Sequence, residues 1–103
     1  MYKLCFFVPA TFAEKVKQAV FETGAGRLGN YEECAWQTSG QGQFKPLATA
    51  NPFIGASGRL ERVEELRVEL LCSDDVVHEA VRVLKKAHPY ECPAYDVVKL
   101  EEI

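Results

Sequence analysis

The 103-residue sequence lacks the features that identify several large classes of protein. It has no basic stripe: its formal net charge is -3 and its tightest positive cluster is Lys85-Lys86, which argues against nucleic acid as a partner. It has no run of about 18 apolar residues, as a membrane-spanning helix requires. The apolar N-terminus is too short for a signal peptide and has no small-residue cleavage site. We therefore expect a cytoplasmic protein with neither a nucleic-acid nor a membrane partner.

Motifs that mark common catalytic and cofactor sites are also missing. The sequence has no H-E-x-x-H pair, no P-loop, and no serine or cysteine in a recognisable nucleophile turn. No two of its four cysteines have C-x-x-C spacing; they are Cys5, Cys34, Cys72 and Cys92. Because the chain has ample ordinary core, we expect buried, reduced thiols rather than a disulfide framework. We predict no catalytic residue and no cofactor.

Residues 1–103 are predicted to form a single domain, because a chain of this length has no room for a second core. With 48% hydrophobic residues, the chain can build that core without disulfides or a structural metal. An apolar strand is predicted over 2–8, and Thr11 and Glu14 then have the spacing of a capping box that starts a helix. Glycine, serine and glutamine in the next segment favour a hairpin. Its strands are expected at 31–38 and 43–46, around a turn at 39–42.

The second half of the chain repeats the order strand, helix, strand. Apolar and polar residues alternate over 65–72, which predicts a strand with one buried face. Ser73 is a typical N-cap for the next helix, and Pro89 makes that helix stop near Ala87. The last strand is expected at 94–100.

This order predicts an α+β fold, the ferredoxin-like βαβ-βαβ sandwich with two helices on one face of an antiparallel sheet and an extra hairpin. The other face has no partner within the chain. Phe7, Trp36 and Phe44 make that face too apolar to be fully wet, so we expect a homo-oligomer.

Residues 24–29 match the pattern G-x-G-x-x-G as G-A-G-R-L-G. A dinucleotide-binding fingerprint needs a strand before it and a helix after it, and here the order is reversed. The glycines better suit a helix stop and a tight turn. The alternative is a backbone nest for a small anion, formed around Gly26 and Gly29 with Arg27 alongside.

The segment 88–95, H-P-Y-E-C-P-A-Y, brings several reactive side chains together at the junction of the second helix and the last strand. His88, Glu91 and Cys92 have nitrogen, oxygen and sulfur atoms that bind metal ions. One short loop with two prolines seldom wraps three ligands around one ion, so a metal site would need a second subunit. The alternative is a rigid corner that fixes how helix meets strand.

Four stretches in fixed order carry a family resemblance. They are G-R-L-G-N-Y at 26–31, G-Q-F-K-P at 42–46, N-P-F-I-G at 51–55 and A-H-P-Y-E-C-P-A-Y-D at 87–96. Over residues 4–100 the chain resembles the domain inserted in the longer Nif-three-like proteins of the YqfO type. That domain is similar in fold to the trimeric PII signalling and CutA proteins, and CutA carries a His-Pro-Tyr-Glu segment at the equivalent corner.

The resemblance implies a fold and an assembly but no catalytic residue. In full-length members a dinuclear metal centre is built in two flanking lobes, which this sequence does not contain, so their hydrolase or cyclohydrolase labels are not implied. At Cys92 the family often has an acidic residue, so no carboxylate role is carried over to that position. We expect a non-enzymatic regulatory or interaction domain that forms a homo-oligomer, a trimer.

An alternative is a protein that binds a divalent metal or a small anion. Its metal ligands would come from the 88–92 corner, and the ligand-binding candidates are Gly26, Arg27, Gly29, Asn51 and Tyr90.

Overall fold

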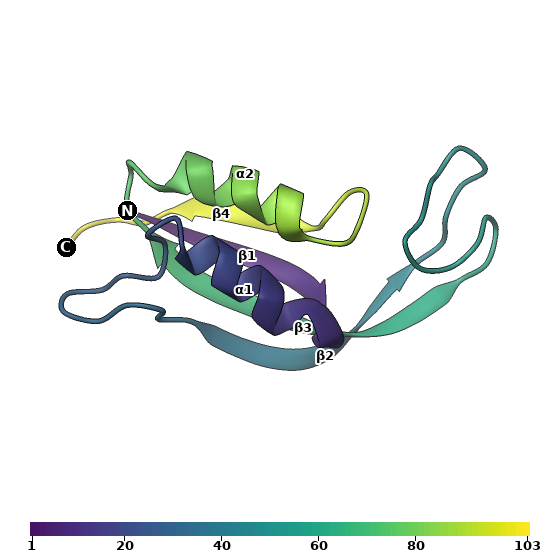
Figure 1. Ribbon diagram of the computed structural model, residues 1–103, viewed down its shortest axis with the longest axis horizontal. Helices are drawn as coiled ribbons and strands as arrows, with labels where there is room; N and C mark the ends of the chain where they lie inside the picture. The colour runs from purple at the N-terminus through teal and green to yellow at the C-terminus, as the bar shows by residue number, and fades with distance from the viewer.

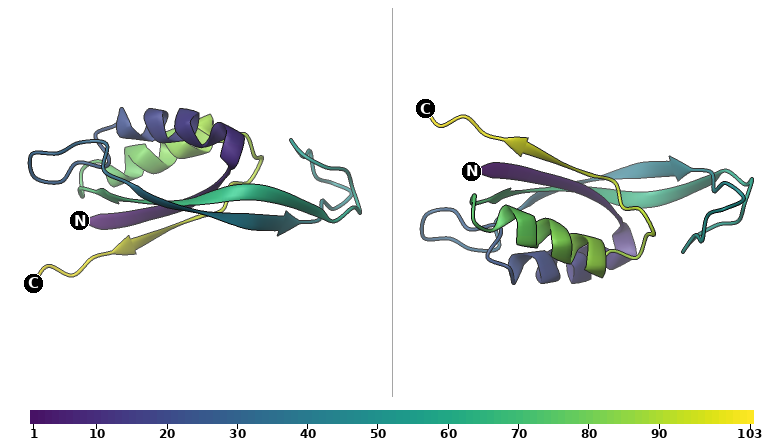
Figure 2. Two further views of the ribbon diagram at one scale, coloured as in Figure 1. Left: turned by 90° about the horizontal axis from the view of Figure 1, so that it is seen from below. Right: turned by 90° about the horizontal axis from the view of Figure 1, so that it is seen from above.

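The computed structural model describes residues 1–103, which form one four-stranded sheet and two α-helices. The elements are β1 (Tyr2–Pro9), the short 3-10 helix η1 (Ala10–Phe12), α1 (Ala13–Phe21), β2 (Trp36–Phe44), β3 (Glu61–Cys72), α2 (Val77–Ala87) and β4 (Tyr95–Lys99). The strand order is β2-β3-β1-β4, with every neighbouring pair antiparallel. Both helices lie on one face of the sheet (Figures 1 and 2). The predicted α+β fold is confirmed.

The core lies between the sheet and the two helices. Alternate residues of β1 point to it, and Leu4, Phe6 and Val8 are completely buried. Register pairs Leu4 with Leu70 and Phe6 with Val68, so the buried side chains of β3 share that face. The helices close the core with the buried side chains Ala13, Val16, Val20, Val77, Ala80 and Leu84. Burial of each large apolar side chain contributes roughly 1.5–3 kcal/mol.

The predicted hairpin at 31–46 is wrong. Residues 36–44 form one continuous strand, every residue of which pairs with β3, and the predicted turn at 39–42 lies in its middle. The cause is non-local: β3 begins at Glu61, earlier than expected, and offers partners to the whole segment. β2 and β3 therefore continue past the end of β1 and carry the 45–60 loop away from the helices (Figure 1). There is no extra hairpin.

Both helices begin later than their expected caps. The Thr11–Glu14 capping box does not form, because a turn of 3-10 helix precedes α1 and Phe12 occupies its N-cap. The Ser73 hydroxyl donates to Asp75 Oδ1 at 2.6 Å and so does not cap the helix. The Ser73 carbonyl accepts the amides of Val76, just before α2, and of Val77, its first residue. In both cases backbone hydrogen bonds of a preceding turn satisfy the amides that a side-chain cap would have bound.

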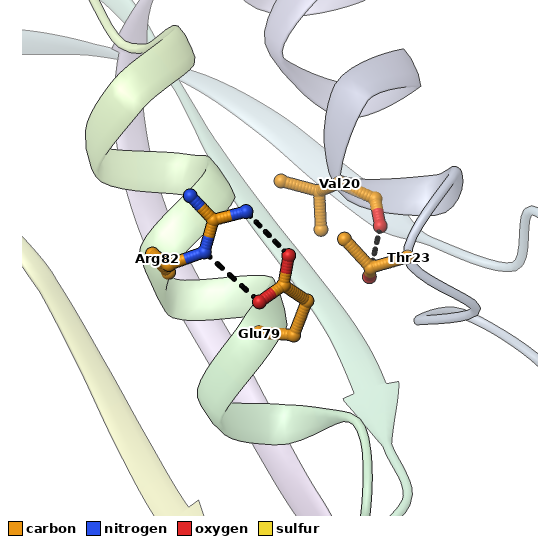
Figure 3. Close-up of polar contacts among 4 residues, drawn as sticks. All are labelled: Val20, Thr23, Glu79 and Arg82. Atoms are coloured by element: carbon orange, nitrogen blue, oxygen red, sulfur yellow. Dashed lines mark hydrogen bonds and ion pairs between the residues drawn. The ribbon is translucent and has the colours of Figure 1, made fainter.

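Polar side chains make local hydrogen bonds just after α1 and along the exposed side of α2. The Thr23 hydroxyl donates to the Val20 carbonyl at 2.6 Å just beyond α1, and Gly24 follows with a φ of +98°, as expected of a glycine at a helix end. On α2 the Arg82 guanidinium binds the Glu79 carboxylate through two nitrogens, one turn apart (Figure 3). No helix of the chain is long and apolar enough to cross a membrane.

The face of the sheet opposite the helices is less apolar than expected. At its centre Glu69 binds Lys3 at 3.6 Å and Arg67 at 3.2 Å, and Cys5 on the same face is buried. The exposed apolar side chains of this face lie on the two edge strands. Trp36 of β2 is 61% exposed, and Val98 of β4, which pairs with Lys3 of β1, is 50% exposed. The open face is therefore polar in the middle and apolar at its margins.

All four cysteines are free thiols, as expected. Cys5 and Cys72 are buried, and burial raises the pKa of the Cys72 thiol to about 11, so it is an inert core residue. Cys92 is exposed, so the expectation of burial is wrong for this one. It lies in a loop that no helix or strand covers.

Candidate functional site

A cleft of about 270 Å³ lies beside the 88–95 corner, where β1 ends and the β2–β3 ribbon continues. Its walls come from the end of β2 with the loop that follows it and from the corner itself, together with Phe7 of β1 and Glu65 of β3. Phe7, Phe44, Phe53 and Tyr90 provide aromatic surface. Three of the four stretches that carry the family resemblance thus meet at one place. We call this hollow the corner cleft.

His88 fixes the corner to the sheet from behind the cleft. It is 5% exposed, its Nε2 lies 2.7 Å from the Phe7 carbonyl, and its Nδ1 accepts the Tyr90 amide at 3.1 Å. A carbonyl can only accept, so Nε2 carries the proton; Nδ1 accepts an amide and therefore carries none, so the ring is neutral. Burial lowers the pKa of His88, which favours the same neutral form. The side chain therefore acts as a brace between the end of β1 and the corner.

Tyr90 and Glu65 form the polar floor of the corner cleft. The Tyr90 hydroxyl donates to Glu65 Oε2 at 2.9 Å, and its ring lies against Phe44 with 5.7 Å between centroids. Burial, and then the Glu65 carboxylate, raise the pKa of the Tyr90 phenol, so Tyr90 stays a donor at all physiological pH values. A Cβ at Gly42 would overlap the Glu65 carboxylate, so the glycine of the 42–46 stretch makes room for it.

The 51–55 stretch is tied to the corner by one hydrogen bond across the cleft mouth. The Asn51 amide donates to Glu91 Oε2 at 3.1 Å, although 40 residues separate the two in sequence. On the other side of the loop, the Phe53 ring meets Phe12 edge-on with 5.4 Å between centroids. Cys92 completes this wall as an exposed thiol. The loop is thus held on both sides.

The Gly26–Gly29 loop lies at the opposite end of the sheet from the corner. The Gly26 amide donates to the Leu71 carbonyl at 2.8 Å, and the Leu28 amide donates to Tyr31 at 2.9 Å. These two amides are committed to protein carbonyls, and Arg27 is exposed beside them. The structure thus separates Gly26, Arg27 and Gly29 from the other site candidates. An anion nest at this loop stays a prediction, but the amides of Gly26 and Leu28 are not available as donors to an anion.

The metal interpretation also stays a prediction. Nowhere in the chain do three or more histidine, cysteine, aspartate or glutamate side chains lie close enough to hold an ion. Both ring nitrogens of His88 already have partners, whereas Glu91 and Cys92 are exposed. A metal at this corner would therefore have to displace a hydrogen bond of His88 and recruit ligands from a second subunit.

Sequence reasoning missed Glu65, the charged floor of the corner cleft. Alternation over 65–72 places Glu65 on the polar face of the strand, but alternation does not show which side chains of other elements lie opposite it. The signal was indirect: Gly42 and Tyr90 sit in two of the four family stretches. Only the register of β2 on β3 brings them to the same carboxylate.

Comparison with solved structures defines the type of fold. The chain is an α+β domain of the CutA and PII-like type. The structure of CutA from Pyrococcus horikoshii matches with a TM-score of 0.70 at 21% identity, covering 100% of this chain and 87% of that one. The PII-like protein CutA from Nostoc sp. PCC 7120 matches with a TM-score of 0.69 at 15% identity, covering 98% of this chain and 82% of that one. At these identities the likeness shows the fold.

Within that class the chain belongs to the NIF3-related family. A Bacillus cereus protein related to NIF3 matches with a TM-score of 0.82 at 39% identity over 98% of this chain and 26% of that one. The relatives from Halalkalibacterium halodurans and Mycobacterium tuberculosis, each named GTP cyclohydrolase 1 type 2 homolog, are 45% and 43% identical. The alignments cover 97% and 95% of this chain, but only 27% and 26% of those proteins. No family model matches.

The chain thus spans about a quarter of the length of the curated relatives it matches. The family resemblance drawn from the four sequence stretches is confirmed.

Proposed function

We propose that this chain is a non-enzymatic regulatory or protein-interaction domain that assembles into a homo-oligomer, a trimer. The observation that carries the proposal is that both free edges of the sheet bear exposed apolar side chains. β2 and β4 are the two edge strands, and each presents unpaired backbone groups along its outer side. Exposed edges of this kind are normally covered or paired.

The position of the apolar side chains supports edge contact over face-to-face stacking. Glu69 and its ion-pair partners cover the centre of the open face, and burying them would cost desolvation energy. Trp36 on β2 and Val98 on β4 lie at opposite margins of this face. A contact that joins one chain's β2 margin to the next chain's β4 margin is head-to-tail, and such contacts form a ring when the rotation between neighbours closes. A three-membered ring would bury both edges.

The lining of the corner cleft supports a non-enzymatic role. Both ring nitrogens of His88, the histidine of the corner, are hydrogen-bonded to the backbone, so neither is available to a substrate. Cys92 is exposed, and no histidine lines the cleft beside it. The name GTP cyclohydrolase 1 type 2 homolog belongs to proteins of which this chain spans about a quarter. We infer that any reaction of those proteins uses their remaining length.

Light scattering tests the assembly. We expect about three times the mass of the 11.5 kDa chain at working concentration. Trp36→Glu places a charge on the exposed margin and should shift the mass toward the monomer. Leu47→Glu is the matched control, because Leu47 is 75% exposed on the distant loop. A wild-type chain that stays monomeric, or a Leu47 variant that dissociates equally, would refute the edge-contact proposal.

The alternative function, binding of a divalent cation, has weaker support. The structure from Archaeoglobus fulgidus described as a periplasmic divalent cation tolerance protein CutA shares the fold, with a TM-score of 0.69 at 16% identity. Glu91 and Cys92 are exposed, so a second subunit could reach both. Calorimetric titration of zinc into the wild type and into His88→Ala tests this function. If the function is correct, the wild type binds zinc and the variant does not.

A further inference from the structure

We propose that the corner cleft binds a small organic cation, an ammonium or guanidinium group carried on an apolar body. Two of its lining residues, Gln43 and Phe44, belong to the edge strand β2, but all residues of the site come from one chain and the inference does not depend on the assembly. The inference rests on three features of the cleft: the sign of its charges, the fixed position of one carboxylate, and its aromatic walls.

The charges of the corner cleft are all of one sign. Glu65 and Glu91 are the charged residues of its lining, and neither forms an ion pair within the chain. The nearby cation, Arg67, binds Glu69 at 3.2 Å instead of either cleft carboxylate. An anionic ligand would be repelled by both glutamates, whereas a cation would supply the missing partner. The cleft therefore selects for positive charge.

The Glu65 carboxylate is held in place before any ligand arrives. The Tyr90 hydroxyl donates to Oε2 at 2.9 Å, and the lack of a side chain at Gly42 leaves space for the carboxylate against β2. Tyr90 occupies one carboxylate oxygen, which leaves lone pairs for a charged donor. A fixed acceptor costs a ligand less entropy than a mobile surface glutamate, so charge-assisted bonds to it are stronger.

The walls of the corner cleft suit the apolar body of such a ligand. Phe44 and Tyr90 pack edge-on, and Phe53, 54% exposed, leaves ring surface open at the mouth. Aromatic faces attract cations as well as apolar groups. The volume of about 270 Å³ is slightly below that of typical ligand clefts, roughly 300–1,000 Å³. The ligand is therefore small, about the size of one aromatic amine.

Three probes of one shape and different charge test the selection. Phenethylammonium is the cation, 2-phenylethanol the neutral analogue and 3-phenylpropionate the anion, each titrated into the isotopically labelled protein by NMR. We expect the cation to shift the amide signals of Asn51 and Tyr90, which lie at the cleft, and to bind about tenfold more tightly than the alcohol. The anion should cause no such shifts. Equal binding of cation and anion, or no binding of the cation, would overturn the proposal.

Charge-neutral variants locate the binding. Glu65→Gln keeps the shape of the floor and should weaken phenethylammonium about tenfold. Glu64→Gln is the matched control, since the neighbouring Glu64 is exposed and does not line the cleft. Tyr90→Phe provides a second test if the first variant fails to fold, because it frees the carboxylate from its anchor and should also weaken the cation. Unchanged affinity in both Glu65→Gln and Tyr90→Phe would refute the site.

Discussion

Replacing His88 by alanine tests whether the corner is a structural brace. The side chain is almost fully buried and joins the Phe7 carbonyl to the Tyr90 amide through its two ring nitrogens. The substitution removes both hydrogen bonds and leaves a backbone carbonyl and an amide without their partners. It leaves the backbone bond of the His88 amide to Leu84, which ends α2, in place. The loss should therefore fall on the joint between the corner and β1.

The structure sets the size of the effect. Each hydrogen bond contributes about 1 kcal/mol net, and burying unpaired backbone groups costs about 1–3 kcal/mol more where water does not reach them. The vacated ring also leaves a cavity. We expect His88→Ala to lower the free energy of unfolding by about 3 kcal/mol, a large share of the roughly 5–15 kcal/mol of a domain this size.

Urea denaturation at pH 7.5 measures this loss. His78→Ala is the matched control, because His78 lies on the exposed side of α2 and its replacement should change stability by less than about 0.5 kcal/mol. If His88→Ala lost less than about 1 kcal/mol, the hydrogen bonds at the corner would not brace it. The argument for a structural corner would then be wrong.

The pH dependence of stability gives the same brace an independent signature. Burial lowers the pKa of His88 in the folded state below its ordinary value of about 6.5. Below that pH the unfolded chain binds a proton that the folded chain resists, so stability falls as the pH drops and is fully present above it. Protonation would also remove the acceptor of the Tyr90 amide. The slope between pH 7 and pH 5 should shrink in His88→Ala; an unchanged slope would contradict this assignment.

Two further predictions concern other joints of the fold. Gly26→Ala should cost about 2–3 kcal/mol in thermal unfolding, because Gly26 has a φ of +82° and a new Cβ would meet the Phe21 ring at 2.9 Å. Gly29→Ala shares a positive φ but has open space around it, so a cost of about 1 kcal/mol is expected; equal costs would show that the ring contact is immaterial. Tyr90→Phe should lower the free energy of unfolding by about 1–2 kcal/mol, because the hydrogen bond to Glu65 is lost. Unchanged stability in urea denaturation would show that this hydrogen bond does not stabilise the fold.

Patterns confined to one element were read correctly from the sequence. Alternation over 65–72 predicted which side chains of β3 face the core, because a strand repeats its faces at a fixed period. The stop of α2 before Pro89 was predicted for the same kind of reason: proline restricts the residue before it. These features depend on neighbours within a few positions.

Features that depend on distant partners were misread or missed. The glycines at 40 and 42 predicted a turn, but β3 supplies a pairing partner to the whole of 36–44 and keeps the segment extended. The expected caps of both helices gave way to turns whose backbone bonds the sequence did not reveal. Glu65 was taken for a surface residue until the sheet placed Tyr90 and Gly42 around it.

The sequence by itself determined the fold class, the family and the importance of the His88–Tyr95 segment. Periodicity and proline placement act locally. The order of the family stretches along the chain can be recognised without knowing how they are arranged in space. Only the tertiary structure decided that His88 braces the sheet and that the corner forms one wall of a cleft. Those roles depend on contacts across 25 to 81 positions of sequence, such as Tyr90 with Glu65 and His88 with Phe7, which no local pattern encodes.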